Sequence, residues 1–409
     1  MKWGWGRGRT VVAAVLGVLA MLAGCVDAGA GAERGESAGA GADRGAGEVA
    51  GSSAPARPGS APPPIPSSPD LPGVPHAVGF AADATGFALL AECGEAPCRQ
   101  HVAVLDKGAD SWRLGRSPLP DVTGGFGITA GLVVLGPGRV LITEGWLPPP
   151  DRTWFTDDGG RTWRRGSVAP SGTTPEVPEG GALVQDCSRL DEEGNNCEAS
   201  RLLVILPDTG RFEVLANQPP LAGRLGPAGE TADGLLFASG TDPSSGLPAL
   251  AVSEDRGRTW RTAPLTSSDK QGWGIQVVAS GDVLYAVQSG PLPAEEGVKN
   301  GLRALHRSTD GGHTWERVRR YRKGVDPRST LGDPVAAADG SLTIHGEDGV
   351  WRSTDGGRSF EAARGSQGLG GSATVTPLGY LAGDSFGVGS YRISADGIRW
   401  HSFVLGDGD

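Results

Sequence analysis

The side chains that could perform chemistry in this chain are acids and large aromatics in polar loops between short apolar runs. Aromatic rings beside carboxylates suit a sugar or a cationic peptide, and two facing carboxylates could cleave a glycosidic bond. Acids in exposed loops are also commonly just solvated, and the sequence leaves both interpretations open. The candidate ligand-contacting residues are Glu144, Trp146, Asp151, Trp273, Glu295, Glu347, Asp348 and Asp384.

Composition and motif content exclude several other kinds of chemistry. The formal net charge is −10, which argues against a nucleic-acid partner because phosphate contacts need a basic surface. The sequence has no spacing typical of a zinc site, a phosphate-binding loop or a nucleophile elbow. The acidic run 191–196 lacks the spacing of a known calcium loop. We therefore expect no metal and no cofactor.

A repeated motif indicates how the chain positions these loops. Its best copy, residues 308–315, reads Ser-Thr-Asp-Gly-Gly-His-Thr-Trp. Close copies span 156–163, 253–260 and 353–360, and degraded copies span 106–112, 208–212 and 394–400. A period of about 48 residues, seven times over, is typical of a propeller built from four-stranded blades. The predicted fold is therefore an all-β, seven-bladed propeller of antiparallel blades, with almost no helical periodicity.

Each copy of the motif reads as a hairpin turn between two strands. The Asp carboxylate accepts backbone N–H groups of the turn, Gly supplies a positive φ, and the closing aromatic starts the next strand and becomes buried. The role of these side chains is structural. They are Asp158, Trp163, Asp255, Trp260, Asp310, Trp315, Asp355, Phe360, Asp396 and Trp400.

These motifs resemble the Asp-box (BNR) repeat of sialidase-like propellers, over about residues 76–409. The resemblance implies that the boxes lie on the rim, far from any active site. It also implies that ligands bind at the central face, on loops joining the second strand of a blade to the third and one blade to the next. The loop acids and aromatics named above would then line that face.

Active sialidases of this kind use three Arg, an Asp acid/base, a Tyr–Glu nucleophile pair and a Phe/Tyr-Arg-Ile-Pro stretch in the first blade. This chain departs from that pattern. Its nearest match is Tyr391-Arg392-Ile393, followed by Ser394 and placed in the last blade. None of its four Tyr has an obvious Glu partner in the sequence. No catalytic residue is carried over, and the catalytic residues stay unknown.

The N-terminus is typical of an exported lipoprotein. Residues 1–24 combine positive charge with a short apolar run, as signal peptides do, and Leu22-Ala23-Gly24-Cys25 resembles a bacterial lipobox. Cleavage before Cys25 and its lipidation would anchor the protein on the outer face of the membrane; a plain signal peptide is the alternative. Residues 25–72, rich in Gly, Ala, Ser and Pro, predict a disordered linker, and residues 73–409 the propeller.

Four cysteines remain once Cys25 is lipidated, and they allow three pairings. Cys93–Cys98 and Cys187–Cys197 are favoured, because each pair brackets a short polar loop and an exported protein meets oxidising conditions. A metal site is less consistent with the spacing. Ring closure is expected to use the first ordered strand, near Val78–Ala82.

Two functions follow from these observations. The first is a cell-surface lipoprotein whose non-catalytic propeller binds a protein or glycan as an assembly module. The alternative is an extracellular glycoside hydrolase, exo-sialidase-like or polysaccharide-cleaving. The sequence does not indicate the oligomeric state.

Overall fold

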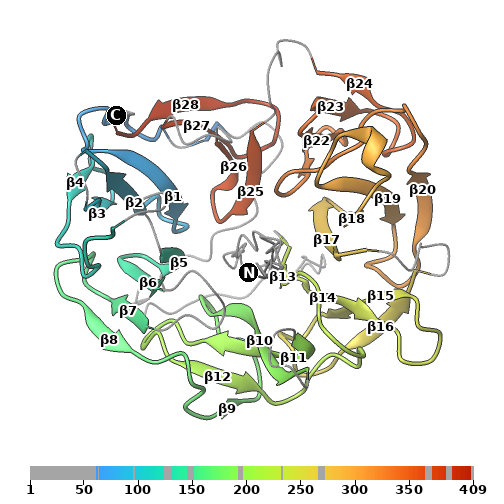
Figure 1. Cartoon of the computed structure of the whole chain (residues 1–409), viewed down its shortest axis with the longest axis horizontal. Coiled ribbons are helices and arrows are strands. Elements are labelled where there is room, and N and C mark those ends of the chain that lie inside the picture. Colours follow the sequence, from blue (N-terminus) through green and yellow to red (C-terminus); the bar gives the residue numbers. More distant parts are fainter. Residues whose placement is uncertain are drawn as a thin grey trace, which may run out of the picture.

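Seven four-stranded sheets follow one another around a ring in a computed structural model of the chain (Figure 1). The model describes residues 61–62, 64–94, 97–123, 130–144, 152–191, 197–231, 234–265, 272–363, 371–383 and 389–406. The predicted seven-bladed propeller is confirmed. Within these ranges the one helical element is the short 3-10 helix η1 (Ala294–Glu296), and no helix is long and apolar enough to cross a membrane.

Blades 1 to 3 come from the N-terminal half of the chain. Blade 1 contains β1 (Val74–Phe80), β2 (Gly86–Glu92), β3 (Arg99–Leu105) and β4 (Arg113–Leu114). Blade 2 contains β5 (Ala130–Gly136), β6 (Arg139–Glu144), β7 (Arg152–Thr156) and β8 (Arg164–Gly166). Blade 3 contains β9 (Thr173–Thr174), β10 (Ala182–Leu190), β11 (Cys197–Ile205) and β12 (Phe212–Leu215).

Blades 4 to 7 repeat the same order of strands. Blade 4 contains β13 (Ala228–Glu230), β14 (Leu236–Thr241), β15 (Pro248–Ser253) and β16 (Arg261–Pro264). Blade 5 contains β17 (Gly274–Ser280), β18 (Val283–Gly290), β19 (Gly301–Ser308) and β20 (Glu316–Arg320). Blade 6 contains β21 (Val335–Ala336), β22 (Leu342–Gly346), β23 (Gly349–Ser353) and β24 (Glu361–Ala362). Blade 7 contains β25 (Ser372–Thr376), β26 (Gly379–Gly383), β27 (Ser390–Ser394) and β28 (His401–Val404).

The core lies between neighbouring blades. Phe87 of blade 1 and Ile142 of blade 2 belong to one buried cluster, and Leu250 of blade 4 shares another with Ile275 of blade 5. Both faces of the middle strands are therefore covered, which is why β2 reads as a nearly continuous apolar run instead of alternating.

Blade 3 departs from the simple pattern. Its sheet order is β10-β11-β12-β9, and β9 pairs parallel to β12 at the outer edge, whereas the other six sheets are antiparallel throughout. Its β10–β11 hairpin carries the Cys187–Cys197 disulfide, and Cys93–Cys98 closes the β2–β3 loop. Both expected pairings are present.

The box turns repeat one set of hydrogen bonds. In the blade 6 box, Asp355 Oδ1 accepts the Ser359 N–H at 2.9 Å, and Asp355 Oδ2 accepts the Ser359 hydroxyl at 2.6 Å. The Ser353 hydroxyl in turn accepts the Gly357 N–H at 2.8 Å. The equivalent contacts recur at Asp158, Asp255 and Asp310. These carboxylates therefore close the hairpins that precede the outermost strands.

The ring closes through residues 65–68, which the sequence predicts to belong to the linker. Ser68 forms a parallel bridge with Leu405, donates its N–H to Val404 O at 2.8 Å and accepts the Gly406 N–H at 3.1 Å. Ile65 is buried beside Phe403 in the cluster that joins blade 7 to blade 1. The expectation of closure near Val78–Ala82 was wrong, because β1 there is already the first strand of blade 1. The propeller also includes residues before 73, since Ile65 and Leu71 pack in the cluster between blades 7 and 1.

Candidate functional site

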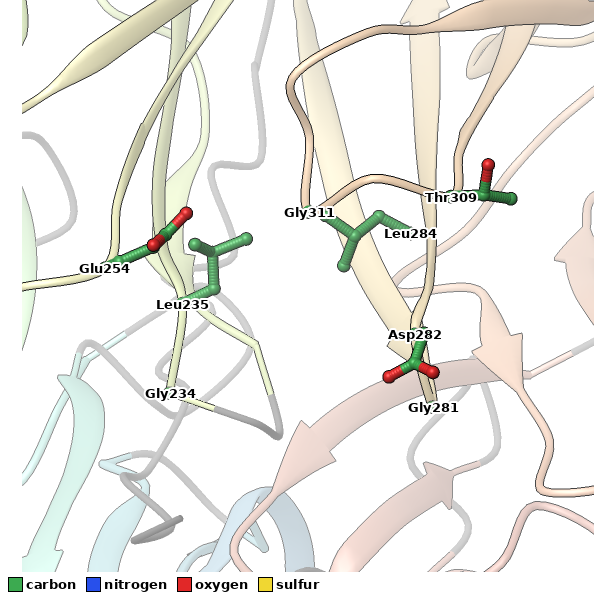
Figure 2. Close-up of a pocket in the computed structure, with 8 residues that line it drawn as sticks. All are labelled: Gly234, Leu235, Glu254, Gly281, Asp282, Leu284, Thr309 and Gly311. Carbon is green, nitrogen blue, oxygen red and sulfur yellow. The ribbon is translucent and has the colours of Figure 1, made fainter. Parts of the chain in front are cut away.

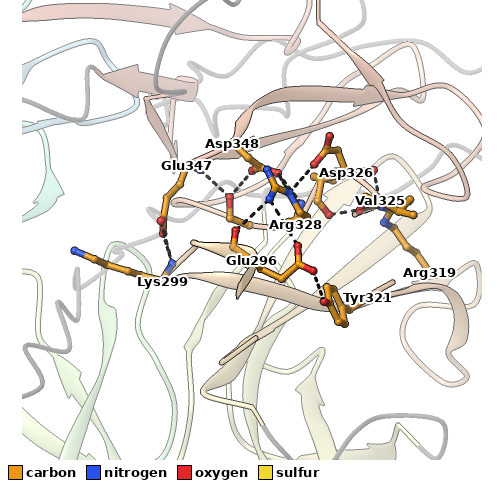
Figure 3. Close-up of polar contacts among 11 residues, drawn as sticks. Glu296, Lys299, Arg319, Tyr321, Val325, Asp326, Arg328, Glu347 and Asp348 are labelled. Atoms are coloured by element: carbon orange, nitrogen blue, oxygen red, sulfur yellow. Dashed lines mark hydrogen bonds and ion pairs between the residues drawn. The ribbon is translucent and has the colours of Figure 1, made fainter. Parts of the chain in front are cut away.

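A cluster of hydrogen-bonded charged side chains lies between blades 5 and 6, on the face that carries the loops between the second and third strands. Three segments meet there: residues 291–300 with η1, residues 321–334 between β20 and β21, and Glu347-Asp348 between β22 and β23 (Figure 3). This site, called here the Arg328 cluster, contains Glu296, Tyr321, Asp326, Arg328, Ser329 and Asp348.

Arg328 joins the three segments. Its Nε lies 2.8 Å from Asp326 Oδ1 and 3.6 Å from Asp348 Oδ2, and its Nη1 lies 3.6 Å from Glu296 Oε2. Asp348 also accepts the backbone N–H of Arg328 at 2.8 Å and the hydroxyl of Ser329. The Glu296 and Asp348 side chains are only 4 % and 2 % exposed. The guanidinium thus neutralises carboxylates that could not otherwise be buried.

Glu347 is engaged by backbone groups. Its Oε1 accepts the Asn300 N–H and the Asn300 side-chain amide, each at 2.8 Å, and its Oε2 accepts the Lys299 N–H at 3.0 Å. This carboxylate therefore fixes the loop before β19 onto the β22–β23 turn. It is a positioning side chain of the face, which the sequence did not indicate.

Tyr321 and Glu296 form a pair that the sequence does not predict. The Tyr321 hydroxyl donates to Glu296 Oε1 at 2.6 Å. This hydrogen bond, with smaller contributions from desolvation and nearby charges, raises the pKa of Tyr321 to about 12. The two residues are 25 positions apart, and neither has a motif around it, so no local signal could have found them. Tyr321 directly follows β20, the outermost strand of blade 5.

The other predicted face residues have separate environments. Glu144 at the end of β6 is buried, accepts the Trp154 indole N–H at 3.1 Å and lies 3.8 Å from Arg152. Glu295 is exposed and lies 3.4 Å from Lys323. Trp273, directly before β17, is 44 % exposed. Trp146, Asp151, Asp384 and Cys25 lie outside the described residues.

The chemistry open to these groups is limited by their partners. A glycosidase needs a sugar between its two carboxyl groups, whereas a guanidinium fills the space between Glu296 and Asp348. The stretch Tyr391-Arg392-Ile393 is structural: Tyr391 stacks on Phe403 at 5.4 Å, Arg392 lies over Trp400, and Ile393 is fully buried. In the described part of this face, the loop carboxylates are therefore held by hydrogen bonds and ion pairs, and the Trp273 indole is exposed.

Comparison with known proteins gives only distant structural matches. No protein family model matches the sequence, and no curated protein matches it. Hydrazine synthase of Kuenenia stuttgartiensis is 17% identical, covers 78% of this chain and 94% of its own, and gives a TM-score of 0.46. A polysaccharide lyase, an ulvan lyase of family PL25, is 10% identical with coverages of 85% and 95% and a TM-score of 0.44.

The GH74 enzyme of Niastella koreensis is also similar, at 16% identity and a TM-score of 0.26, over 80% of this chain. The chain spans only about half of that enzyme, 54% of its length. At such identities and TM-scores no site residue is carried across to this chain.

Proposed function

We propose that this chain is an exported lipoprotein, lipidated at Cys25, whose propeller binds a protein or glycan without catalysis. The composition of the segment between Cys25 and Ile65 suits a flexible linker that holds the ring away from the membrane. The binding face would be the one that carries the Arg328 cluster and Trp273.

The observation that carries this proposal is the engagement of the candidate carboxylates. Asp348 binds Arg328, Glu347 binds the loop before β19, and Glu144 binds Trp154. Side chains held by such contacts are pre-organised, and a rigid surface loses little entropy when it binds. Trp273 adds an exposed ring of the kind that stacks on sugars or anchors a protein partner.

The test combines binding with product analysis on the mature protein. Sialosides and cell-wall polysaccharides are titrated while tryptophan fluorescence is recorded, and released sugar is measured in the same samples. Binding without release is expected, with affinity reduced at least tenfold by Trp273→Ala. Ile398→Ala is the matched control, since Ile398 is also 44 % exposed but lies in the blade 7 box on the opposite face. Equal losses in both variants would contradict a site at Trp273. If no glycan binds, the same two variants are compared in a pull-down of envelope proteins.

One observation favours glycoside hydrolysis as the second candidate. Tyr321 and Glu296 are the residue types of a sialidase nucleophile pair and are hydrogen-bonded. Sugar release that Tyr321→Phe abolishes, while thermal stability is retained, would establish hydrolysis and overturn the non-catalytic proposal.

A further inference from the structure

A cavity of about 290 Å³ lies between blades 4 and 5 on the opposite face, where the box turns are. Leu235 and Glu254 approach it from blade 4, and Asp282, Leu284, Thr309 and Gly311 approach it from blade 5 (Figure 2). Its floor is apolar, since Leu235 and Leu284 are buried. The groove thus combines an apolar floor with two carboxylates, one from each blade.

The equivalent groove between blades 3 and 4 shows what such a space accepts. There Arg256 fills it with its own side chain: Nε donates to Val177 O at 2.6 Å, Nη2 donates to Pro178 O at 3.0 Å, and Nη1 lies 3.3 Å from Glu230 Oε1. Arg256 occupies the fourth position of its box, with φ of 60°. The groove between blades 3 and 4 is therefore occupied by a guanidinium that binds two carbonyl oxygens and a carboxylate.

The same box position in blade 5 is Gly311, with φ of 65°. A Cβ added there would meet nothing within 4 Å. The groove between blades 4 and 5 therefore has an acidic lining but no side chain at the fourth box position, and the cation at its edge is Arg261, whose Nη1 donates to Gly312 O at 3.2 Å. Glu254 has one neighbouring cation: Arg261 Nη2 lies 3.4 Å from Glu254 Oε1 and 3.3 Å from Gly311 O. Asp282 makes no ion pair with any described residue.

We propose that this groove binds a cationic side chain, an arginine or lysine presented by a basic peptide segment of a partner. The aliphatic stem would cover Leu235 and Leu284, as such stems do on apolar surfaces, and the charged head would lie between Glu254 and Asp282. The site is on the face opposite Trp273, so this proposal does not depend on the function proposed above.

The experiment uses the mature protein and three probes: agmatine, a capped Gly-Gly-Arg-Gly-Gly peptide, and the same peptide with citrulline in place of arginine. Ligand-observed NMR titration is expected to give a Kd on the order of 1 mM for agmatine and no saturation with the citrulline peptide. Tighter binding of the arginine peptide than of agmatine is expected for a peptide partner. If the arginine peptide and agmatine bound with equal affinity, or if agmatine alone bound, the inference of a peptide partner would be overturned. The groove would then be a site for a small cation.

Three variants locate the site. Glu254→Gln with Asp282→Asn is expected to weaken agmatine binding at least tenfold, and Gly311→Arg to abolish it by supplying the cation from within. Glu361→Gln with Asp110→Asn, which changes two exposed acids elsewhere on the ring, is the matched control and should leave the Kd unchanged. Thermal unfolding confirms that each variant folds. Absence of saturable agmatine binding to the unmodified protein, or a Kd that the double acid variant leaves unchanged, would overturn the proposal.

Discussion

The Trp112 indole Nε1 donates to the Pro66 carbonyl oxygen at 3.0 Å. In blades 2 and 4 the closing Trp of the box makes the same contact with the chain that leaves the preceding blade: Trp163 donates to Arg116 O at 2.7 Å, and Trp260 donates to Asn217 O at 2.8 Å. Residues 65–68 therefore occupy, for blade 1, the place that a preceding blade fills elsewhere. Ile65, Ser67 and Ser68 of this segment form hydrogen bonds with β28 of blade 7, so the segment joins the two ends of the ring.

The first prediction concerns this closing segment. Ile65→Ala is expected to lower the free energy of unfolding by about 2–5 kcal/mol, because Ile65 is 2 % exposed in a cluster with Phe80 and Phe403. Urea unfolding measures the change, and Val404→Ala, at a half-exposed position on β28, is the control with little expected effect. A chain that starts at residue 73 should lose at least as much stability as Ile65→Ala. Equal stability of chains starting at 61 and 73 would contradict closure by this segment.

The second prediction concerns a box carboxylate. Hydrogen bonds from the Ser359 hydroxyl and backbone N–H lower the pKa of Asp355 to about 2. Asp355→Ala removes the charged acceptor of these donors, and because both residues are exposed and water can replace it, the loss of unfolding free energy should be about 0.5–1.5 kcal/mol. The stabilisation is fully present above the unfolded pKa of 3.8 and is lost as the pH falls through the folded value. Asp157→Ala, at a box position whose carboxylate pairs with the exposed Arg164, should change stability much less. A similar loss in both variants would argue against the box role of Asp355.

The sequence was informative wherever a contact is local. The turn geometry at Asp310 and Asp355 lies within one motif, and each disulfide joins cysteines at most ten positions apart. The closing segment was missed because Ile65 stands alone among Pro and Ser, and one apolar side chain in such a stretch does not predict burial. Its partners Phe403 and Trp112 are distant in the chain, so only the closed ring brings them to Ile65.

The candidate face could be predicted only as a set of loops. Glu347 and Asp348 were identified as residues of that face, but their partners Asn300 and Arg328 come from other segments. The Tyr321–Glu296 pair likewise joins two separate segments of the chain. Whether a loop acid is exposed to solvent or bound to another residue depends on how the loops of two neighbouring blades align. The spacing of the repeats does not predict that alignment.

The third prediction addresses the Arg328 cluster. Arg328→Met removes the cation but leaves Glu296 and Asp348 buried, and is expected to cost about 3–5 kcal/mol. Tyr321→Phe removes one hydrogen bond to Glu296 and is expected to lower stability much less than Arg328→Met does. Urea unfolding at pH 7 measures both changes. If Arg328→Met were as stable as the unmodified protein, the cluster would not brace the loops between blades 5 and 6.

The last prediction concerns Asp333, which links three blades. Its carboxylate accepts the Gln276 amide from blade 5 and the Val375 N–H at 3.0 Å from blade 7, and its own N–H donates to Ala373 O at 2.7 Å. No cation pairs with it among the described residues, and burial raises its pKa to about 6 from 3.8. The folded protein therefore holds a proton that the unfolded chain releases between these two pH values.

The sign of the effect follows from this difference. The contribution of Asp333 to stability is fully present below pH 3.8 and is lost as the pH rises through about 6, in total about 3 kcal/mol. Asp333→Asn keeps an acceptor for Val375 and cannot ionise, so the stability difference between the two proteins should change by most of that amount from pH 4 to pH 7 and favour the variant at pH 7. His306 and His345, whose pKa values burial lowers to about 4, titrate in both proteins, so the comparison removes their effect. Urea unfolding of both proteins across this pH range provides the test: a difference that stays constant with pH would mean that Asp333 is already ionised in the folded ring.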